Sequence, residues 1–146
     1  MSTLKKGFTL IELLVVISII GILMAISLFG MQGARESSRD ARRKLDLGMI
    51  QSGLEIYKSD CNIYPASLGN SLVGSGSPTS CAITNTYISS VPQDPLYPNR
   101  LYPYSYTAAT KTYTLCASLE NPPSPAVDTT GCGSCGTACN YKVTSP

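Results

Sequence analysis

A continuous apolar segment dominates the first part of the chain. Residues 8–31 are rich in isoleucine, leucine and valine, and Glu12 is the only ionisable side chain among them. As a helix rising about 1.5 Å per residue, these 24 residues reach about 36 Å, which exceeds the roughly 30 Å hydrocarbon core of a bilayer. The segment is also longer than the apolar part of a secretory signal, about 7–15 residues. The pattern therefore predicts one transmembrane helix.

The spacing of apolar positions changes after this segment. Residues 32–60 are predicted to continue the helix, and one apolar stripe recurs in them at spacings of three and four. The stripe consists of Leu47, Ile50, Leu54 and Tyr57. Ahead of it, residues 35–44 are polar almost all round. We expect the stripe to pack on a globular domain. Residues 35–44 should be a solvated helix face, or else contact membrane phosphates or acidic neighbours.

Turn-forming residues divide the rest of the chain. Pro65 is expected to end the helix, because proline disfavours helical backbone in the residue before it. Residues 67–80 and 87–95 form two further breaks rich in turn residues. Between 102 and 117, apolar and polar positions alternate on either side of a turn at 108–111, which predicts a β-hairpin or the start of a short antiparallel sheet. The tail, 121–146, is rich in Pro, Gly, Ser and Thr, and we expect little regular structure in it.

Composition narrows the possible functions. The chain has no histidine and no tryptophan, which removes the commonest general base and the commonest zinc-ligand pairings. The part beyond the apolar segment has about 110 residues, enough for one small domain. Asp94 and Glu120 could form a carboxylate pair for hydrolysis, but each stands beside prolines in a turn. We therefore predict that the protein is not an enzyme and needs no cofactor.

Glu12 is the physical anomaly of the apolar segment. A lone carboxylate inside a membrane helix costs a few kcal/mol and marks a functional site, although it could also stay protonated or lie near the headgroups. Lys5 and Lys6 precede the segment and favour a cytoplasmic N-terminus, whereas the arginines that follow it between 35 and 43 argue for the opposite orientation.

The start of the apolar segment resembles the prepilin signature of type IV pilins and type II secretion pseudopilins. The resemblance rests on Lys5-Lys6-Gly7-Phe8-Thr9-Leu10-Ile11-Glu12-Leu13-Leu14-Val15-Val16-Ile17. It implies that a prepilin peptidase cuts between Gly7 and Phe8 on the cytoplasmic side and methylates the new amine of Phe8. It also implies that Glu12 contacts the Phe8 ammonium of a neighbouring subunit during assembly. Opposite charges in an apolar filament core are tolerable only as a pair, so Glu12 could set the register between helices.

A second resemblance covers the later part of the chain. Leu54-Glu55-x-Tyr57-x-x-Asp60-x-x-x-Tyr64-Pro65, Tyr87-Ile88-x-x-Val91-Pro92-x-Asp94-Pro95 and Tyr104-x-Tyr106 are similar to the major pseudopilin of type II secretion. The implied fold is α+β and type IV pilin-like, with a long N-terminal helix packed on a small antiparallel β-sheet and a disulfide-stapled irregular tail. The expected organisation is a leader peptide at 1–7, a transmembrane and assembly helix at 8–31, its continuation at 32–60, and a globular head at 61–146. Some pseudopilins bind calcium in a late loop, but Glu120 and Asp128 are the only acids there, too few for a calcium site.

These resemblances imply a structural subunit of a type IV filament, either a pseudopilin of type II secretion or a pilin. It would cross the bacterial inner membrane once, with a cytoplasmic N-terminus, and then join a periplasmic or cell-surface filament. Its partners would be copies of itself, minor pilins or pseudopilins, the prepilin peptidase, and an inner-membrane platform with its ATPase. Without Lys5 and Lys6, nine basic side chains balance nine acidic ones. We therefore expect no nucleic-acid partner, and we expect the tyrosines to pack on the helix stripe with their hydroxyls toward water.

All cysteines lie beyond the apolar segment: Cys61, Cys81, Cys116, Cys132, Cys135 and Cys139. An even number in a small exported domain predicts disulfides, but six cysteines allow 15 pairings and the sequence does not choose among them. We favour a bond from Cys61 to Cys81, and one from Cys116 to a tail cysteine. The alternative is a zinc site at Cys132-x-x-Cys135-x-x-x-Cys139 with Cys116, in a membrane-anchored metal-binding module that uses the same leader. A redox role for Cys132 and Cys135 is less favoured, because no thioredoxin-like strand–helix pattern surrounds them.

Overall fold

The computed structural model describes residues 7–146, so Lys5, Lys6 and nearly all of the predicted leader lie outside the described residues. Helix α1 (Leu10–Cys61) is 52 residues long and is the only helix among the described residues. The chain divides into two compact units between Glu36 and Ser37. Each unit is described on its own below.

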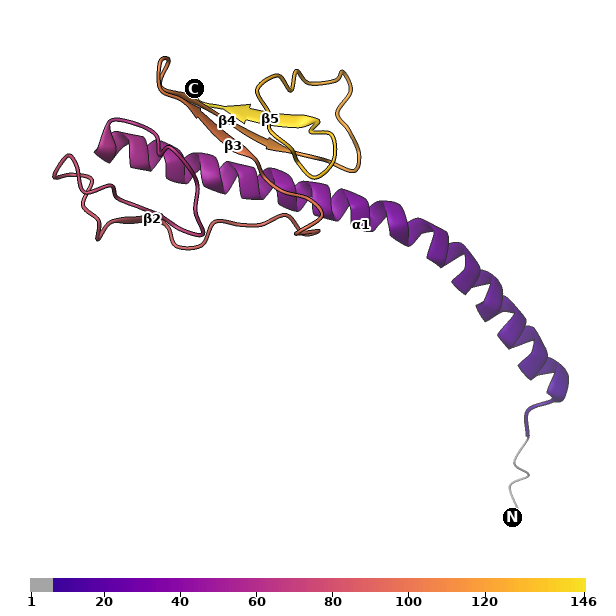
Figure 1. Ribbon diagram of the computed structural model, residues 1–146. Helices are drawn as coiled ribbons and strands as arrows, with labels where there is room; N and C mark the ends of the chain where they lie inside the picture. The colour runs from indigo at the N-terminus through magenta and orange to yellow at the C-terminus, as the bar shows by residue number, and fades with distance from the viewer. Residues whose placement is uncertain (1–6) are drawn as a thin grey trace, which may run out of the picture. The chain divides into compact units, whose positions relative to one another are not determined.

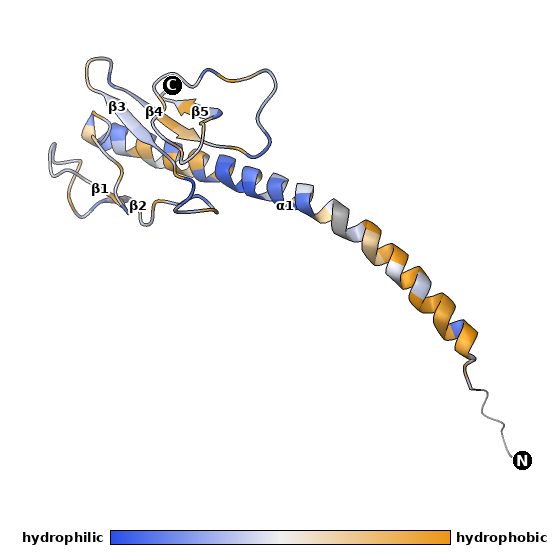
Figure 2. Cartoon of the chain, turned by 45° about the vertical axis from the view of Figure 1, so that its right-hand side comes forward, coloured by the Kyte–Doolittle hydropathy of each residue, from blue (hydrophilic) through white to orange (hydrophobic). Residues whose placement is uncertain are grey.

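The N-terminal unit, which ends at Glu36, contains the apolar part of α1. Every side chain at 8–27 is exposed, and the helix is long and apolar enough to cross a membrane; its apolar part is orange in Figure 2. The hydroxyls of Ser18 and Ser27 donate to the carbonyls of Leu14 and Leu23 at 2.8 and 3.0 Å. These bonds satisfy the hydroxyls within the helix, as a lipid environment requires. The predicted transmembrane helix is thus supported as a candidate span.

The second unit, Ser37–Pro146, is a head in which α1 packs against five strands (Figure 1). Strands β1 (Leu72–Val73) and β2 (Thr86–Ile88) form a two-stranded antiparallel sheet. Strands β3 (Tyr104–Thr107), β4 (Thr112–Ala117) and β5 (Tyr141–Thr144) form a three-stranded antiparallel sheet in the order β3-β4-β5. The predicted α+β fold with a small antiparallel sheet is confirmed.

The predicted hairpin is confirmed, but the expectation for the tail is wrong in one place. β3 and β4 pair in register from Tyr104 with Leu115 to Thr107 with Thr112. In the tail, β5 pairs with β4 and sets Val143 opposite Leu115. The apolar positions of β5 alternate, as a half-buried strand requires, but this short run is hidden within a tail rich in loop-forming residues.

The predicted stripe of α1 forms the centre of the head. Leu47, Ile50 and Leu54 are fully buried and Tyr57 is nearly so. Facing them, β4 buries the alternate residues Tyr113, Leu115 and Ala117, while Tyr64, Leu72 and Ile88 close the cluster from the loops and the smaller sheet. Burial of each large apolar side chain contributes about 1.5–3 kcal/mol. This cluster is therefore the main source of stability in the head.

Two local features fix how α1 fits the head. At Gly53, any Cβ would overlap the Ile88 side chain, so glycine allows β2 to approach the helix closely. The helix ends at Cys61 because Asn62 adopts a left-handed backbone with φ of 61°, and its N–H donates to the Lys58 carbonyl at 2.8 Å. Asparagine is one of the few residues that occupy this helix-ending conformation at low cost. The helix ends within one residue of the predicted boundary at 60.

Candidate functional site

The first turn of α1 is closed by reciprocal contacts between Thr9 and Glu12. The Thr9 backbone N–H and hydroxyl donate to Glu12 Oε2 at 2.8 and 2.7 Å, and the Glu12 N–H donates to Thr9 Oγ1 at 3.3 Å. This is a capping box, in which the two side chains satisfy backbone donors that the start of a helix leaves unpaired. Within one subunit, Glu12 therefore stabilises the start of the helix.

The predicted cleavage junction lies immediately ahead of this cap. Gly7 and Phe8 precede α1 in non-helical backbone, and the Phe8 side chain is 86% exposed. Both hydrogen bonds that Glu12 accepts end on Oε2. No donor among residues 7–146 reaches Oε1, which leaves this oxygen able to accept a further donor. The structure thus brings Gly7, Phe8 and Glu12 together in one accessible segment.

A buried ionic cluster lies where α1 enters the head. The Arg43 guanidinium donates to both Asp94 carboxylate oxygens, at 2.7 Å from Nε and 3.1 Å from Nη2. Its Nη1 donates to Asp40 Oδ1 at 2.7 Å and to Glu120 Oε1 at 2.8 Å. Arg39 also pairs with Glu120, with Nε 2.6 Å from Oε1 and a second contact from Nη2 to Oε2. One helix is thereby joined to two loops that are distant in sequence.

This cluster corrects, at Asp40 and Arg43, the expectation that residues 35–44 form a solvated face; most of the other residues in this stretch are exposed. Arg43 is fully buried and Asp40 is 6% exposed, whereas Arg42 points outward with 68% of its side chain exposed. The sequence carried a signal for the difference. Asp40 and Arg43 precede Leu47 at the same spacing of three and four that relates the stripe residues, so they fall on the buried face.

Each carboxylate of the cluster is stabilised in its charged form by hydrogen bonds within the head. Asp40 accepts the backbone N–H groups of Glu120 and Asn121 at 2.9 and 2.8 Å. Burial alone would raise the pKa of Asp40, but these N–H groups and Arg43 hold it below its usual value. Hydrogen bonds from Arg39 and Arg43 lower the pKa of Glu120 from 4.5 to about 2. Asp94 and Glu120 are therefore ion-pair partners of Arg43. This structural role accounts for the two carboxylates that could have formed a catalytic pair.

The Glu120 pairing predicts how the head responds to acid. Because the folded-state pKa is depressed, this stabilisation is present above about pH 4.5 and is lost as the pH falls toward about 2. We expect the free energy of unfolding to decrease across this window, and Glu120→Gln to flatten that dependence. The measurement is chemical unfolding of the full chain in detergent as a function of pH.

Asp128 provides the matched control for this pH dependence. Its pKa is also lowered to about 2, by the Thr130 backbone N–H and by Lys142, but its side chain is 66% exposed. Solvent screens an exposed pair, so Asp128→Asn should leave the pH dependence nearly unchanged. Equal flattening by the two variants would show that the buried cluster is not the source.

Several tyrosine hydroxyls do not point to water as expected, because they are hydrogen-bonded to side chains of the helix. Tyr102 donates to Asp46 Oδ2 at 2.9 Å, and Tyr113 donates to Glu55 Oε1 at 3.3 Å. Burial, and then the neighbouring carboxylate, raises the pKa of Tyr102 well above its usual value. A buried hydroxyl without a partner would cost about 1–3 kcal/mol. The aromatic rings therefore pack on α1, and carboxylates of α1 accept hydrogen bonds from their hydroxyls.

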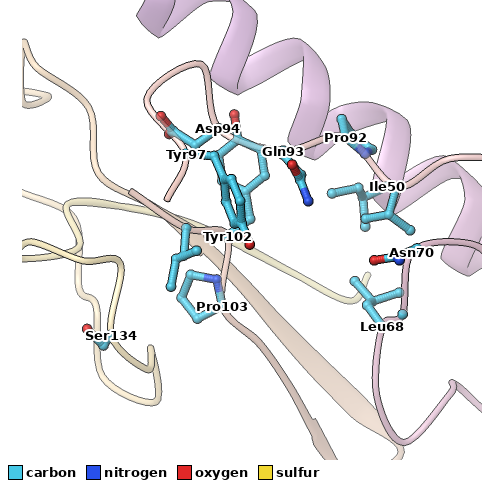
Figure 3. Close-up of a pocket in the computed structure, with 13 residues that line it drawn as sticks. Ile50, Leu68, Asn70, Pro92, Gln93, Asp94, Tyr97, Tyr102, Pro103 and Ser134 are labelled. Carbon is cyan, nitrogen blue, oxygen red and sulfur yellow. The ribbon is translucent and has the colours of Figure 1, made fainter. Parts of the chain in front are cut away.

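A hollow of about 320 Å³ lies between α1 and the loops that lead to β3 (Figure 3). Its lining is largely apolar and includes Ile50, Tyr97 and Leu101, with the side-chain amides of Asn70 and Gln93. Asp94, the single carboxylate among the residues that line it, is already paired with Arg43. The hollow offers apolar contact, but its arrangement does not indicate a reaction.

The cysteines form three disulfides: Cys61–Cys81, Cys116–Cys132 and Cys135–Cys139. The first joins the end of α1 to the loop between β1 and β2, and the second joins β4 to the tail. Closing loops of 20 and 16 residues stabilises a fold by about 3 kcal/mol each in the chain-entropy description. The four cysteines of the alternative zinc site are divided between two disulfides, and no three His, Cys, Asp or Glu side chains within 7–146 lie together as a metal-ligand group.

The three disulfides predict a definite mass. The purified, denatured chain should be six hydrogens lighter before reduction than after it, because each of the three bonds removes two hydrogens. A Cys135→Ser, Cys139→Ser double variant is the control and should differ by four. Recovery of free thiols together with bound zinc would contradict this arrangement.

Together, these features indicate the class of protein. An exposed apolar helix, long enough to cross a membrane and with a capped glutamate near its start, continues into a small, disulfide-stapled head, which fits a membrane-anchored protein. Residues 3–28 match the prokaryotic N-terminal methylation motif, and residues 31–121 match type II secretion system protein G. The chain belongs to the type II secretion system protein G family and is a pilin-like filament subunit.

Several characterised proteins are similar to this chain. The type II secretion system core protein G of Aeromonas hydrophila is 33% identical over 97 residues, which covers 62% of this chain and 67% of the relative. The corresponding protein of Pectobacterium carotovorum is 36% identical over 62 residues, or 42% of this chain and 40% of that protein. The type IV major fimbrial protein FimA of Dichelobacter nodosus is 38% identical over 85 residues, covering 55% and 53%. No solved structure matches the chain. The family consists of structural subunits, which agrees with a role outside catalysis.

Proposed function

We propose that this chain is cut between Gly7 and Phe8, methylated on the new Phe8 amine, and polymerised from the inner membrane through α1. The capped glutamate at the start of an exposed apolar helix carries this proposal. Thr9 occupies only Oε2 of Glu12, so Oε1 can receive the Phe8 ammonium of a neighbouring subunit. In a medium without water, such a pair satisfies two charges that could not be buried singly.

The proposed topology follows from the same segment. The N-terminus lies in the cytoplasm, where a prepilin peptidase acts, and the head lies outside it, where disulfides persist. Partners are further copies of this chain, other pilins or pseudopilins, and an inner-membrane platform driven by its ATPase. The similarity to core protein G favours a periplasmic pseudopilus, and the similarity to a fimbrial protein keeps a surface pilus as the second candidate.

One fractionation tests the processing and the location together. Cells that produce the chain are sheared, released fibres are pelleted, and the N-terminus is identified by mass spectrometry in the fibre and membrane fractions. We expect a chain that begins at Phe8 with one added methyl group. Its presence in fibres identifies a surface pilus, and its retention with the membrane identifies a pseudopilus. A chain that still carries residues 1–7 in both fractions would overturn the proposal.

A further inference from the structure

Three cations that follow the apolar part of α1 are exposed and have no close carboxylate partner: Arg35, Arg42 and Lys44. Among residues 7–146, neither Arg35 nor Lys44 forms an ion pair, and the pair of Arg42 is loose, with Nε 4.0 Å from Asp46 Oδ2. The Lys44 ammonium lies 5.8 Å from the centre of the Tyr141 ring, which leaves its N–H donors available to an anion. We call these three cations the basic collar.

The acidic residues of the same stretch do not neutralise the basic collar. Asp40 is 6% exposed and is paired with Arg43 at 2.7 Å. Asp46 is 7% exposed and accepts a tyrosine hydroxyl at 2.9 Å. The sequence holds one further acid in 32–46, Glu36, against the three exposed cations. The outer surface of this part of α1 is therefore positively charged.

A shallow hollow of about 270 Å³ opens beside Lys44 in the second unit. Ser37, Ala41 and Lys44 line it from successive turns of α1, together with Asp40 and Asn121. The Asp40 oxygens already accept hydrogen bonds from the buried arginine and from backbone N–H groups of the head, which balance the charge of this carboxylate. The Ser37 hydroxyl and the Lys44 ammonium are donors of the kind that phosphate oxygens accept. The hollow therefore suits a phosphate group.

The basic collar follows directly after the apolar segment. A helix rises about 6 Å from Met31 to Arg35 and about 20 Å from Met31 to Lys44, and the polar layer of a bilayer adds about 5–8 Å beyond its hydrocarbon core. Arginine and lysine side chains on a helix extend toward its N-terminus, which here is back toward the apolar segment. The potential of an anionic membrane surface falls off over about 10 Å. When the apolar segment crosses a bilayer, Arg35 is therefore level with the headgroups, and the charges of Arg42 and Lys44 are within reach of their potential.

We propose that the basic collar binds the phosphate groups of acidic membrane phospholipids while the subunit is in the bilayer. The inference goes beyond the proposed function, because it requires a transmembrane apolar segment but neither cleavage nor polymerisation. Charge complementarity and the place of the collar next to the apolar segment favour a lipid surface over an acidic protein. Each lysine or arginine near an anionic surface strengthens binding about fivefold. The three cations together hold the head at the membrane, and high salt weakens this contact.

Amine labelling of the full chain in lipid nanodiscs tests this contact. The chain is inserted in nanodiscs of phosphatidylcholine, with and without phosphatidylglycerol, and is treated with an amine-acetylating reagent. The labelling rate at each lysine is measured by mass spectrometry, and Lys111, which is exposed in the turn between β3 and β4, is the internal control. We expect phosphatidylglycerol to slow the labelling of Lys44 several-fold and to leave that of Lys111 unchanged. High salt should restore the rate at Lys44.

The remaining outcomes separate a lipid from other occupants. Equal slowing at Lys44 and Lys111, or no slowing at either, would overturn the inference. Inorganic phosphate added to phosphatidylcholine nanodiscs should protect Lys44 much less than phosphatidylglycerol does, and equal protection would show that lipid is not the specific occupant. Protection of Lys44 in cell membranes but not in nanodiscs would assign the collar to an acidic protein instead. A chain that does not insert in nanodiscs would overturn the transmembrane helix together with this inference.

Charge-removing variants provide an independent measurement. Arg35→Gln combined with Arg42→Gln removes two cations and keeps Lys44 as the reporter. Both side chains are exposed, so the head should fold as before, which near-ultraviolet circular dichroism of its tyrosines checks. We expect the protection of Lys44 by phosphatidylglycerol to be largely lost, whereas Lys111→Gln, which removes an exposed cation elsewhere, should leave it unchanged. Full protection of Lys44 in the double variant would contradict the role of the basic collar.

Discussion

Replacing Glu12 with glutamine is expected to keep the chain out of filaments while leaving the start of α1 intact. Glutamine can still accept the Thr9 donors, because a capping box functions with either residue. It carries no charge, however, to pair with the Phe8 ammonium of a neighbouring subunit. Leaving one member of a buried ion pair alone costs about 3–5 kcal/mol, so recovery in the filament fraction should fall about a hundredfold or more.

Two further variants separate the charge from the cap. Glu12→Ala removes both, and it should insert in the membrane normally but fail to assemble. Thr9→Ala removes the hydroxyl contacts and leaves the carboxylate, and so it should assemble far better than Glu12→Gln. The measurement is the amount of processed chain in the filament and membrane fractions. Normal filaments from Glu12→Gln, together with poor filaments from Thr9→Ala, would mean that Glu12 serves only as a helix cap.

The second large effect is expected from Arg43→Met. This change leaves Asp40, Asp94 and Glu120 close together in a buried site with Arg39 as the remaining cation of the cluster. Removing one partner of a buried ionic cluster destabilises a protein by about 3–5 kcal/mol. For a domain of this size, we expect the unfolding temperature of the head to fall by more than about 10 °C.

Arg42 supplies the matched control one residue away. Its side chain is 68% exposed, and its Nε lies 4.0 Å from Asp46 Oδ2. Arg42→Met should change the stability by no more than about 1 kcal/mol, because exposed ion pairs contribute little. Arg43→Lys should fall between the two, since lysine keeps the charge but loses the planar fork that holds Asp94 by two bonds. The measurement is thermal unfolding of the full chain in detergent, followed by near-ultraviolet circular dichroism of its tyrosines. Equal effects at positions 42 and 43 would contradict the role of the cluster.

Local patterns were enough to predict the main elements. The apolar run, the stripe from Leu47 to Tyr57, the stop before Pro65 and the alternation around the 108–111 turn each depend on residues close in sequence. Such signals translate directly into helix and strand geometry. The resemblance to prepilins rests on a similarly short stretch around Gly7, Phe8 and Glu12.

Long-range polar contacts were beyond the reach of such patterns. Arg43 contacts Asp94 and Glu120, which lie 51 and 77 residues away in the sequence. Nothing in the spacing of these residues predicts the contact. The helical spacing of Asp40 and Arg43 relative to Leu47 could have predicted that both side chains are buried. It could not have predicted which carboxylates from the loops pair with Arg43. The hydroxyl of Tyr102 likewise finds Asp46 across 56 residues. β5 was missed because its alternation covers only Tyr141–Thr144 within a biased tail.

Besides the apolar core, two contacts hold α1 in the head, and these two would respond differently to mechanical load. At Arg43 the contact is ionic, with Asp94 and Glu120 of two loops, and at Cys61 it is a covalent bond to Cys81. Tension applied to the N-terminal part of the helix acts on the ionic contact first, because Arg43 precedes Cys61 along α1. Ion pairs can part and re-form, whereas the covalent bond keeps the last turn attached throughout. In a stretched subunit, the ion pairs of Arg43 would thus break reversibly, while the Cys61–Cys81 bond keeps the end of α1 joined to the rest of the head.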